Sequence, residues 1–112
     1  MCRKFHGASF ASLCSVHRKG FKWKSGEDVL VDYTAANGTT RTFCGTCGSS
    51  LFFSSPRADS NILEIALGLF DDEIPVIPNA HIFVGSAANW TCIADDLRQY
   101  EESRRSAELG KT

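Results

Sequence analysis

Short runs in which apolar and polar residues alternate recur along this chain, and turn-forming residues separate them. Residues 61–68 are the clearest case, because Leu63, Ile65 and Leu67 alternate with other residue types. A period of two is typical of a strand with one buried face. Similar runs, each bounded by Gly, Ser, Asn or Asp, predict further strands at residues 10–16, 21–24, 29–33, 41–43, 51–53 and 81–84.

Turn and helix signals complete this pattern. Asn37–Gly38 predicts a tight turn, because both residue types tolerate positive φ. Residues 95–109 are the only helix-like stretch, with Glu101 and Arg105 four positions apart. The fold class we predict is mainly β, with antiparallel strands and a short C-terminal helix. We expect one domain over residues 1–101 and a polar C-terminal tail over residues 102–112.

Composition and charge exclude several classes of protein. The 112 residues carry a net charge of −1 with a pI near 6.3, and the basic residues are scattered. Nucleic-acid binding normally requires a basic stripe, so we expect no nucleic-acid partner. No apolar run is long enough to cross a membrane, and the first residues make a poor secretory signal. We therefore expect a cytoplasmic protein with no membrane association.

The strongest chemical signal is the segment from Cys44 to Gly48, in which Cys44 and Cys47 are separated by two residues. Two thiolates at this spacing can hold one zinc ion at a hairpin tip, and the glycines let backbone amides face the sulfurs. Two alternatives remain open. The pair could be a redox dithiol, although that motif normally opens a helix in a βαβ unit, or it could be two reduced surface thiols.

A structural zinc site takes four ligands, and this pair supplies two. The other three of the five cysteines are isolated, and an odd number with one close pair does not resemble a secreted disulfide framework. We expect Cys14 and Cys92 to be small core residues. Cys2 differs, because the neighbouring Arg3 and Lys4 favour the thiolate that binds metal or attacks carbon.

Several segments, in the same order, resemble the glutathione-dependent formaldehyde-activating enzymes, known as the Gfa family. The resemblance runs from Cys2 to about Glu101. The segments that carry it are 2–10, 21–27, 41–49, 67–72, 80–90 and 93–101.

The resemblance implies an Mss4-like β-tent fold, two zinc sites and a carbon–sulfur lyase activity. It implies that Cys44 and Cys47 are ligands of a structural zinc, and that Cys2 is a ligand of a catalytic zinc with an open position. The implied reaction joins glutathione and formaldehyde reversibly into S-(hydroxymethyl)glutathione, so a small thiol is the expected partner.

This sequence also departs from the family pattern. We find no counterpart of the N-terminal segment that supplies a Cys-x-Cys to the structural site and two further cysteines to the catalytic site. This departure favours an alternative, a non-catalytic zinc or interaction module on the same scaffold. A bare sheet edge left by a missing strand would favour a homodimer.

Four other residues have simpler interpretations. We expect His81 to be a hydrogen-bonded structural histidine, and Trp23 and Trp90 to pack in the core or in a hairpin. His6 is a weaker candidate for contact with substrate or metal, on its proximity to Cys2 alone.

Overall fold

The computed structural model describes residues 2–110 and divides the chain into two compact units. We call residues 12–74 the sheet unit, and residues 2–11 together with 75–110 the terminal unit. Each unit is described by itself. No helix within residues 2–110 is both long and apolar enough to span a membrane.

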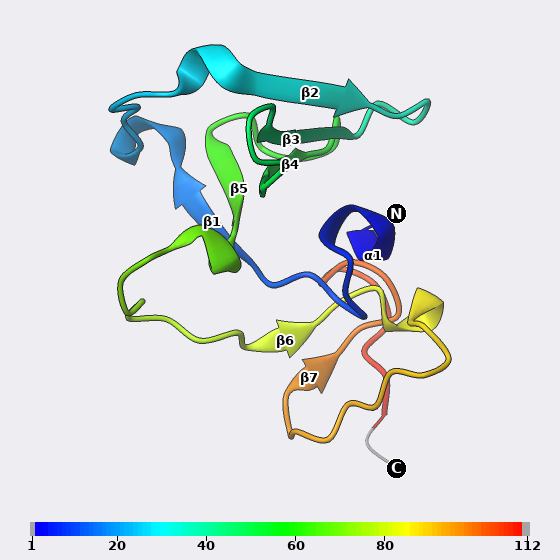
Figure 1. The fold of residues 1–112 in the computed structure, drawn as a ribbon. Helices are drawn as coiled ribbons and strands as arrows, with labels where there is room; N and C mark the ends of the chain where they lie inside the picture. Colours follow the sequence, from blue (N-terminus) through cyan, green and yellow to red (C-terminus); the bar gives the residue numbers. More distant parts are fainter. Residues whose placement is uncertain (1, 111–112) are drawn as a thin grey trace. The chain divides into compact units, whose positions relative to one another are not determined.

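The sheet unit is built on one antiparallel sheet of five strands (Figure 1), in the order β1-β5-β4-β3-β2. The strands are β1 Leu13–His17, β2 Leu30–Thr34, β3 Thr40–Cys44, β4 Ser50–Ser54 and β5 Ile62–Ala66. Strands β2 to β5 are joined as consecutive antiparallel neighbours, and β1 then pairs with β5. The predicted mainly β class is confirmed, and the sheet is consistent with a β-tent.

The hydrophobic core of this unit is centred on β5. Leu63 and Ile65 are 6% and 5% exposed, as their alternation in the sequence predicts. Ala66, at the end of the strand, is 7% exposed. β5 is covered on both edges because it lies between β1 and β4.

The predicted turn at Asn37–Gly38 is confirmed at the β2–β3 connection. Gly38 adopts a φ of +86°. The Asn37 side chain accepts a hydrogen bond from the amide of Thr39 at 3.1 Å, which stabilises the turn between β2 and β3.

The predicted strand at residues 21–24 is wrong, because this segment has no strand pairing. It lies between two short 3₁₀ helices, η1 Arg18–Gly20 and η2 Glu27–Val29. Its aromatic residues pack instead: the Phe21 and Trp23 ring centroids are 5.1 Å apart, at 83°. A third 3₁₀ helix, η3 Leu67–Leu69, follows β5.

The terminal unit contains a five-residue helix, α1 Cys2–His6, and a 3₁₀ helix, η4 Val84–Ser86. It also contains two short parallel strands, β6 Ala80–His81 and β7 Arg98–Gln99 (Figure 1). The sequence did not indicate α1. The strand expected at residues 81–84 is limited to β6, because Phe83 adopts a φ of +56° and ends it.

The predicted C-terminal helix over residues 95–109 is wrong, because the backbone there bonds to distant residues. The amide of Tyr100 donates to His81 O at 2.9 Å, and that of Leu109 donates to Gln99 O at 2.8 Å. A bridge joins Tyr100 to Glu108. A helix over this stretch would have few apolar residues on one face. Its packing would therefore contribute too little free energy to compete with these long-range hydrogen bonds. The expected domain boundary at residue 101 stays a prediction.

Candidate functional site

Cys44 and Cys47 lie at the tip of the β3–β4 hairpin. Cys44 is the last residue of β3, and its amide donates to Ser49 O at 2.9 Å. The amide of Gly48 donates to Cys44 O at 2.7 Å, and Gly48 has a φ of +78°. These bonds fold residues 44–49 into a compact turn, which we call the cysteine knuckle.

Gly45 sets how closely the cysteine knuckle approaches the start of β2. Its amide donates to Val29 O at 2.8 Å. A Cβ atom at this position would lie 2.7 Å from Val29 O and 3.0 Å from Val31 Cγ2. Glycine is therefore required here by space, whereas at Gly48 it is favoured by the positive φ.

The surroundings of Cys47 favour its thiolate. The Ser49 hydroxyl lies 3.1 Å from Cys47 Sγ and can donate to the charged sulfur. This hydroxyl, the Ser49 backbone and the Cys44 thiol lower the pKa of Cys47 below its ordinary value. Cys47 is exposed and Cys44 is half-buried. Sequence analysis did not predict that Ser49 contacts the Cys47 sulfur. The available signal was its position two residues after Cys47 in a tight turn.

The cysteine knuckle fits zinc as part of a site. Two sulfurs at one turn, one of them with a lowered pKa, are the donors that zinc prefers. Among residues 2–110, no group of three or more His, Cys, Asp or Glu side chains is arranged to hold a metal ion. Within the described part of the chain, the cysteine knuckle therefore offers two sulfurs, whereas a tetrahedral zinc site takes four ligands. Their role as metal ligands stays a prediction.

Cys2 lies in the terminal unit as the first residue of α1, and its side chain is half-buried. His6 ends the same helix, and its ring packs edge-on against Phe5 with centroids 5.0 Å apart. The helix thus carries both candidate residues of the N-terminal segment. The catalytic role of Cys2 stays a prediction.

The two cysteines that we expected in the core differ from each other. Cys14, on β1, pairs with Ile65 and is half-buried, and burial together with the charge of Glu64 raises its pKa. The prediction for Cys92 is wrong, because this residue is exposed. It follows η4 in a segment that forms neither helix nor strand.

His81 is hydrogen-bonded as predicted. Its Nε2 lies 2.9 Å from Asp95 Oδ2 and 3.1 Å from Asp95 Oδ1. Asp95 also accepts a hydrogen bond from the amide of Leu97 at 3.0 Å. These two bonds lower the pKa of the Asp95 carboxyl group. Asp95 therefore caps a turn and holds His81.

The two tryptophans also differ. Trp23 is 38% exposed and packs against Phe21 and Phe52, with its ring 5.7 Å from that of Phe52, which confirms its packing role. Trp90 is 64% exposed and lies in a turn outside any strand, so the expectation that it packs in the core or in a hairpin is wrong.

Residues 1–86 match the family described as glutathione-dependent formaldehyde-activating enzyme, which is well over half of the 112-residue chain. The matched range contains Cys2 and the cysteine knuckle and ends before Trp90 and Asp95. No curated protein matches the chain.

Proposed function

Because the chain belongs to the family of glutathione-dependent formaldehyde-activating enzymes, we propose that it is a zinc-dependent carbon–sulfur lyase. Its substrate in this proposal is the adduct of glutathione, or a similar small thiol, with formaldehyde. The observation that carries the proposal is the family match over residues 1–86. The cysteine knuckle lies inside that range and adds a paired-sulfur site.

The reaction balances without an oxidant or a reductant. The sulfur of a glutathione thiolate attacks the carbonyl carbon of formaldehyde, and a carbon–sulfur bond forms as the carbonyl π bond opens. The resulting alkoxide takes up the proton that the thiol released, which gives S-(hydroxymethyl)glutathione. The reverse direction breaks the same carbon–sulfur bond and returns both reactants.

We assign Cys44 and Cys47 to a structural zinc site, and Cys2 to a catalytic zinc site. A zinc ion bound at Cys2 would supply Lewis-acid chemistry, lowering the pKa of a thiol or polarising a carbonyl oxygen. At the cysteine knuckle, Ser49 favours the charged form of Cys47, and Gly45 keeps the turn close to β2. The assignment of Cys2 rests on the resemblance.

The test is the exchange of formaldehyde between its free and thiol-bound forms. Purified protein, reconstituted with zinc under reducing conditions, is mixed with glutathione and ¹³C-formaldehyde, and the exchange rate is measured by NMR. We expect exchange faster than the spontaneous reaction, lost in Cys2→Ser and retained in Cys92→Ser. Cys92 is a suitable control because it is exposed and lies outside residues 1–86. Exchange that is unchanged in Cys2→Ser would remove Cys2 from the catalytic site.

Zinc content tests the cysteine knuckle separately. We expect the zinc content of the reduced wild-type chain to fall in Cys44→Ser and in Cys47→Ser, as measured by atomic emission, whereas zinc bound at Cys2 should remain. An unchanged content would mean that other residues hold the metal.

The second candidate function is a non-catalytic zinc or interaction module. The observation that favours it is that residues 2–110 hold no group of three or more side chains placed to bind a metal ion. Zinc bound in stoichiometric amount without faster exchange would support this candidate over the lyase.

We also propose a cytoplasmic location and a homodimer. The cytoplasm is reducing, which suits five unbridged cysteines and a thiol substrate.

The homodimer is suggested by the sheet edge. Strand β2 lies at one end of the sheet order, so its outer edge has no strand partner within the sheet unit. A second copy would bring a second pair of sulfurs, enough for a four-sulfur site. A monomeric mass by light scattering with one zinc per chain would contradict the dimer.

A further inference from the structure

A pocket of about 370 Å³ lies in the sheet unit, and no step of the proposed reaction uses it. Its volume falls within the range of roughly 300–1,000 Å³ that is typical of small-molecule sites. Three aromatic rings, two residues of opposite charge and a hydroxyl line it: Phe21, Trp23, Phe52, Arg18, Asp32 and Thr42. We call it the aromatic pocket.

The sheet register places part of this lining in one row. Asp32 on β2 pairs with Thr42 on β3, and Thr42 pairs with Phe52 on β4. Residues paired in this way across neighbouring strands present their side chains on one face of a sheet. Leu63 on β5, which is 6% exposed, also lines the pocket and provides a buried apolar surface.

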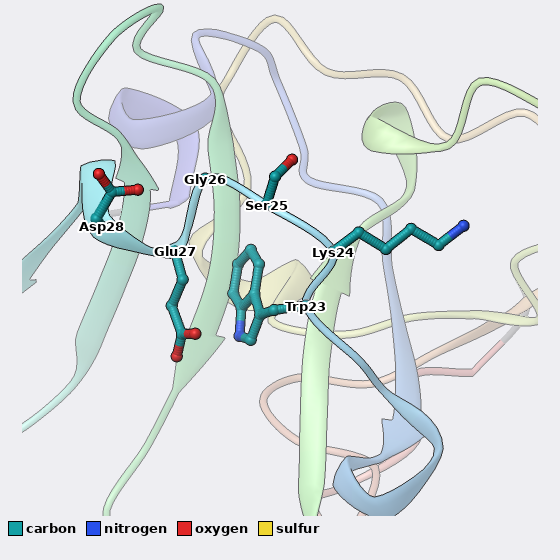
Figure 2. Close-up of a pocket in the computed structure, with 6 residues that line it drawn as sticks. All are labelled: Trp23, Lys24, Ser25, Gly26, Glu27 and Asp28. Atoms are coloured by element: carbon teal, nitrogen blue, oxygen red, sulfur yellow. The ribbon is translucent and has the colours of Figure 1, made fainter.

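The aromatic wall is held by mutual edge-to-face packing. The centroids of Phe21 and Trp23 are 5.1 Å apart, and each ring lies 5.7 Å from Phe52. Figure 2 shows the indole of Trp23 within the bend of the 23–28 loop, whereas the side chain of Lys24 extends away from it. Rings locked in this way offer a rigid apolar surface at little cost in conformational entropy.

Both charged groups are positioned by neutral partners. The Nε of Arg18 donates to Ser60 O at 2.7 Å, and its backbone amide donates to Asn61 O at 2.8 Å. Asp32 Oδ1 accepts a hydrogen bond from Thr42 Oγ1 at 2.5 Å. Within residues 2–110, neither Arg18 nor Asp32 forms an ion pair. The pocket therefore presents a positive and a negative group that do not neutralise each other.

We propose that the aromatic pocket binds a small zwitterion with an apolar body, such as an aromatic α-amino acid. The carboxylate of the ligand bonds to the guanidinium of Arg18, which is suited to bidentate recognition. Its ammonium group bonds to Asp32 and lies near the ring faces that attract cations. Arg18 and Asp32 are both exposed, so a ligand with only one of these charges forgoes one charged hydrogen bond, and a zwitterion is favoured by that difference.

The second surface depression supports no such proposal. It is lined by six consecutive residues, Trp23 to Asp28, which run from the loop into η2 (Figure 2). No residues from distant parts of the sequence converge there.

The test follows the indole NH signal of Trp23 by ¹H–¹⁵N NMR in a Trp90→Phe background, where it is the only indole. Titration with L-phenylalanine is expected to shift this signal in a saturable way. Arg18→Gln and Asp32→Asn should each weaken binding by about two- to fivefold, because each removes one charged hydrogen bond at an exposed position. The matched controls Arg57→Gln and Asp72→Asn change exposed residues outside the pocket lining and should leave binding unchanged.

Two analogues separate the two ends of the pocket. Phenethylamine lacks the carboxylate, so Asp32→Asn should weaken its binding and Arg18→Gln should not. 3-Phenylpropionate lacks the ammonium group, so it should show the opposite dependence. No shift of the Trp23 signal with millimolar phenylalanine, or binding that neither charge change weakens in a folded variant, would overturn the proposal. Neither result depends on zinc or on formaldehyde exchange, so the proposed lyase is tested separately.

Discussion

The two units hold their candidate residues in different ways. In the sheet unit, the cysteine knuckle closes the β3–β4 hairpin, and both strands belong to a five-stranded sheet. In the terminal unit, Cys2 lies on a five-residue helix, and the only ladder joins two strands of two residues each. A sheet fixes a site through many shared hydrogen bonds, whereas the terminal unit depends on a few separate ones. Under conditions that destabilise the protein, we therefore expect the cysteine knuckle to keep its geometry after the helix that carries Cys2 has lost its own.

Core substitutions should produce the largest difference between the units. Ile65→Ala removes a side chain that is 5% exposed and should lower the free energy of unfolding by about 2–4 kcal/mol. Ile93→Ala, at a half-buried position of the terminal unit, should cost only about 1 kcal/mol. Urea unfolding measures both. Equal losses would mean that the terminal unit has a core as tight as that of the sheet.

Glycine substitutions sharpen the comparison at the sites themselves. Gly45→Ala places a Cβ against the rigid backbone of Val29 and should cost about 1–3 kcal/mol and reduce zinc binding. Gly85→Ala, in the terminal unit, meets the carboxylate of the exposed Glu101, which can move aside, so its effect should be small.

Gly68→Ala is the control for these two variants, because nothing lies within 4 Å of a Cβ there and its φ is not positive. Thermal unfolding and zinc content are the measurements. A Gly45→Ala protein as stable as Gly68→Ala would show that the knuckle can move away from β2.

The pKa of Cys47 gives a smaller and more local test. Because the Ser49 hydroxyl is the largest contribution that lowers this pKa, Ser49→Ala should raise it. The pH profile of Cys47 alkylation in the metal-free protein, read by mass spectrometry, should move to higher pH in the variant. An unmoved profile would mean that the backbone and Cys44 alone favour the thiolate.

The smallest effect is expected at the His81–Asp95 pair in the terminal unit. The pKa of Asp95 is lowered in the folded state, mainly by its hydrogen bond with His81. A depressed carboxyl pKa stabilises the fold above the unfolded-state value of about 4. That contribution is lost as the pH falls through the lower folded-state pKa.

The measurement is urea unfolding of wild type and Asp95→Asn at neutral and at acidic pH. The two proteins should differ more at neutral pH than at acidic pH, where Asp95 is protonated. Because Asp95 is exposed, the difference should be small. A difference that grows on acidification would contradict the linkage.

Sequence reasoning was most accurate where the pattern was local. The alternation around Leu63 and Ile65, the turn at Asn37–Gly38 and the hairpin that contains the cysteine knuckle could all be predicted. The predicted family is confirmed by the match over residues 1–86. These features depend on the residues of one strand or one turn.

The features that were missed depend on residues far apart in the chain. The expected helix over residues 95–109 is absent because Tyr100 and Leu109 donate to carbonyl groups outside any helical pattern. The packing of Phe21 and Trp23 on Phe52 was hidden because the alternation of residues 21–24 resembles that of a strand. The charged lining of the aromatic pocket joins η1 to β2, which no sequence spacing indicates.

The strand order also has a consequence for how the chain acquires its fold. Of the five strands of the sheet unit, β1 is synthesised first, yet its partner in this sheet is β5, and Ser15 donates a hydrogen bond to Glu64, 49 positions later. Strands β2 to β5 can form by successive local hairpins, whereas β1 has to wait for the last of them. Long-range pairing of this kind slows folding, because loop closure precedes any gain in contacts. During translation, therefore, residues 13–17 stay unpaired for longer than the other four strands of this sheet, which exposes them to binding by a chaperone or by another unfolded chain.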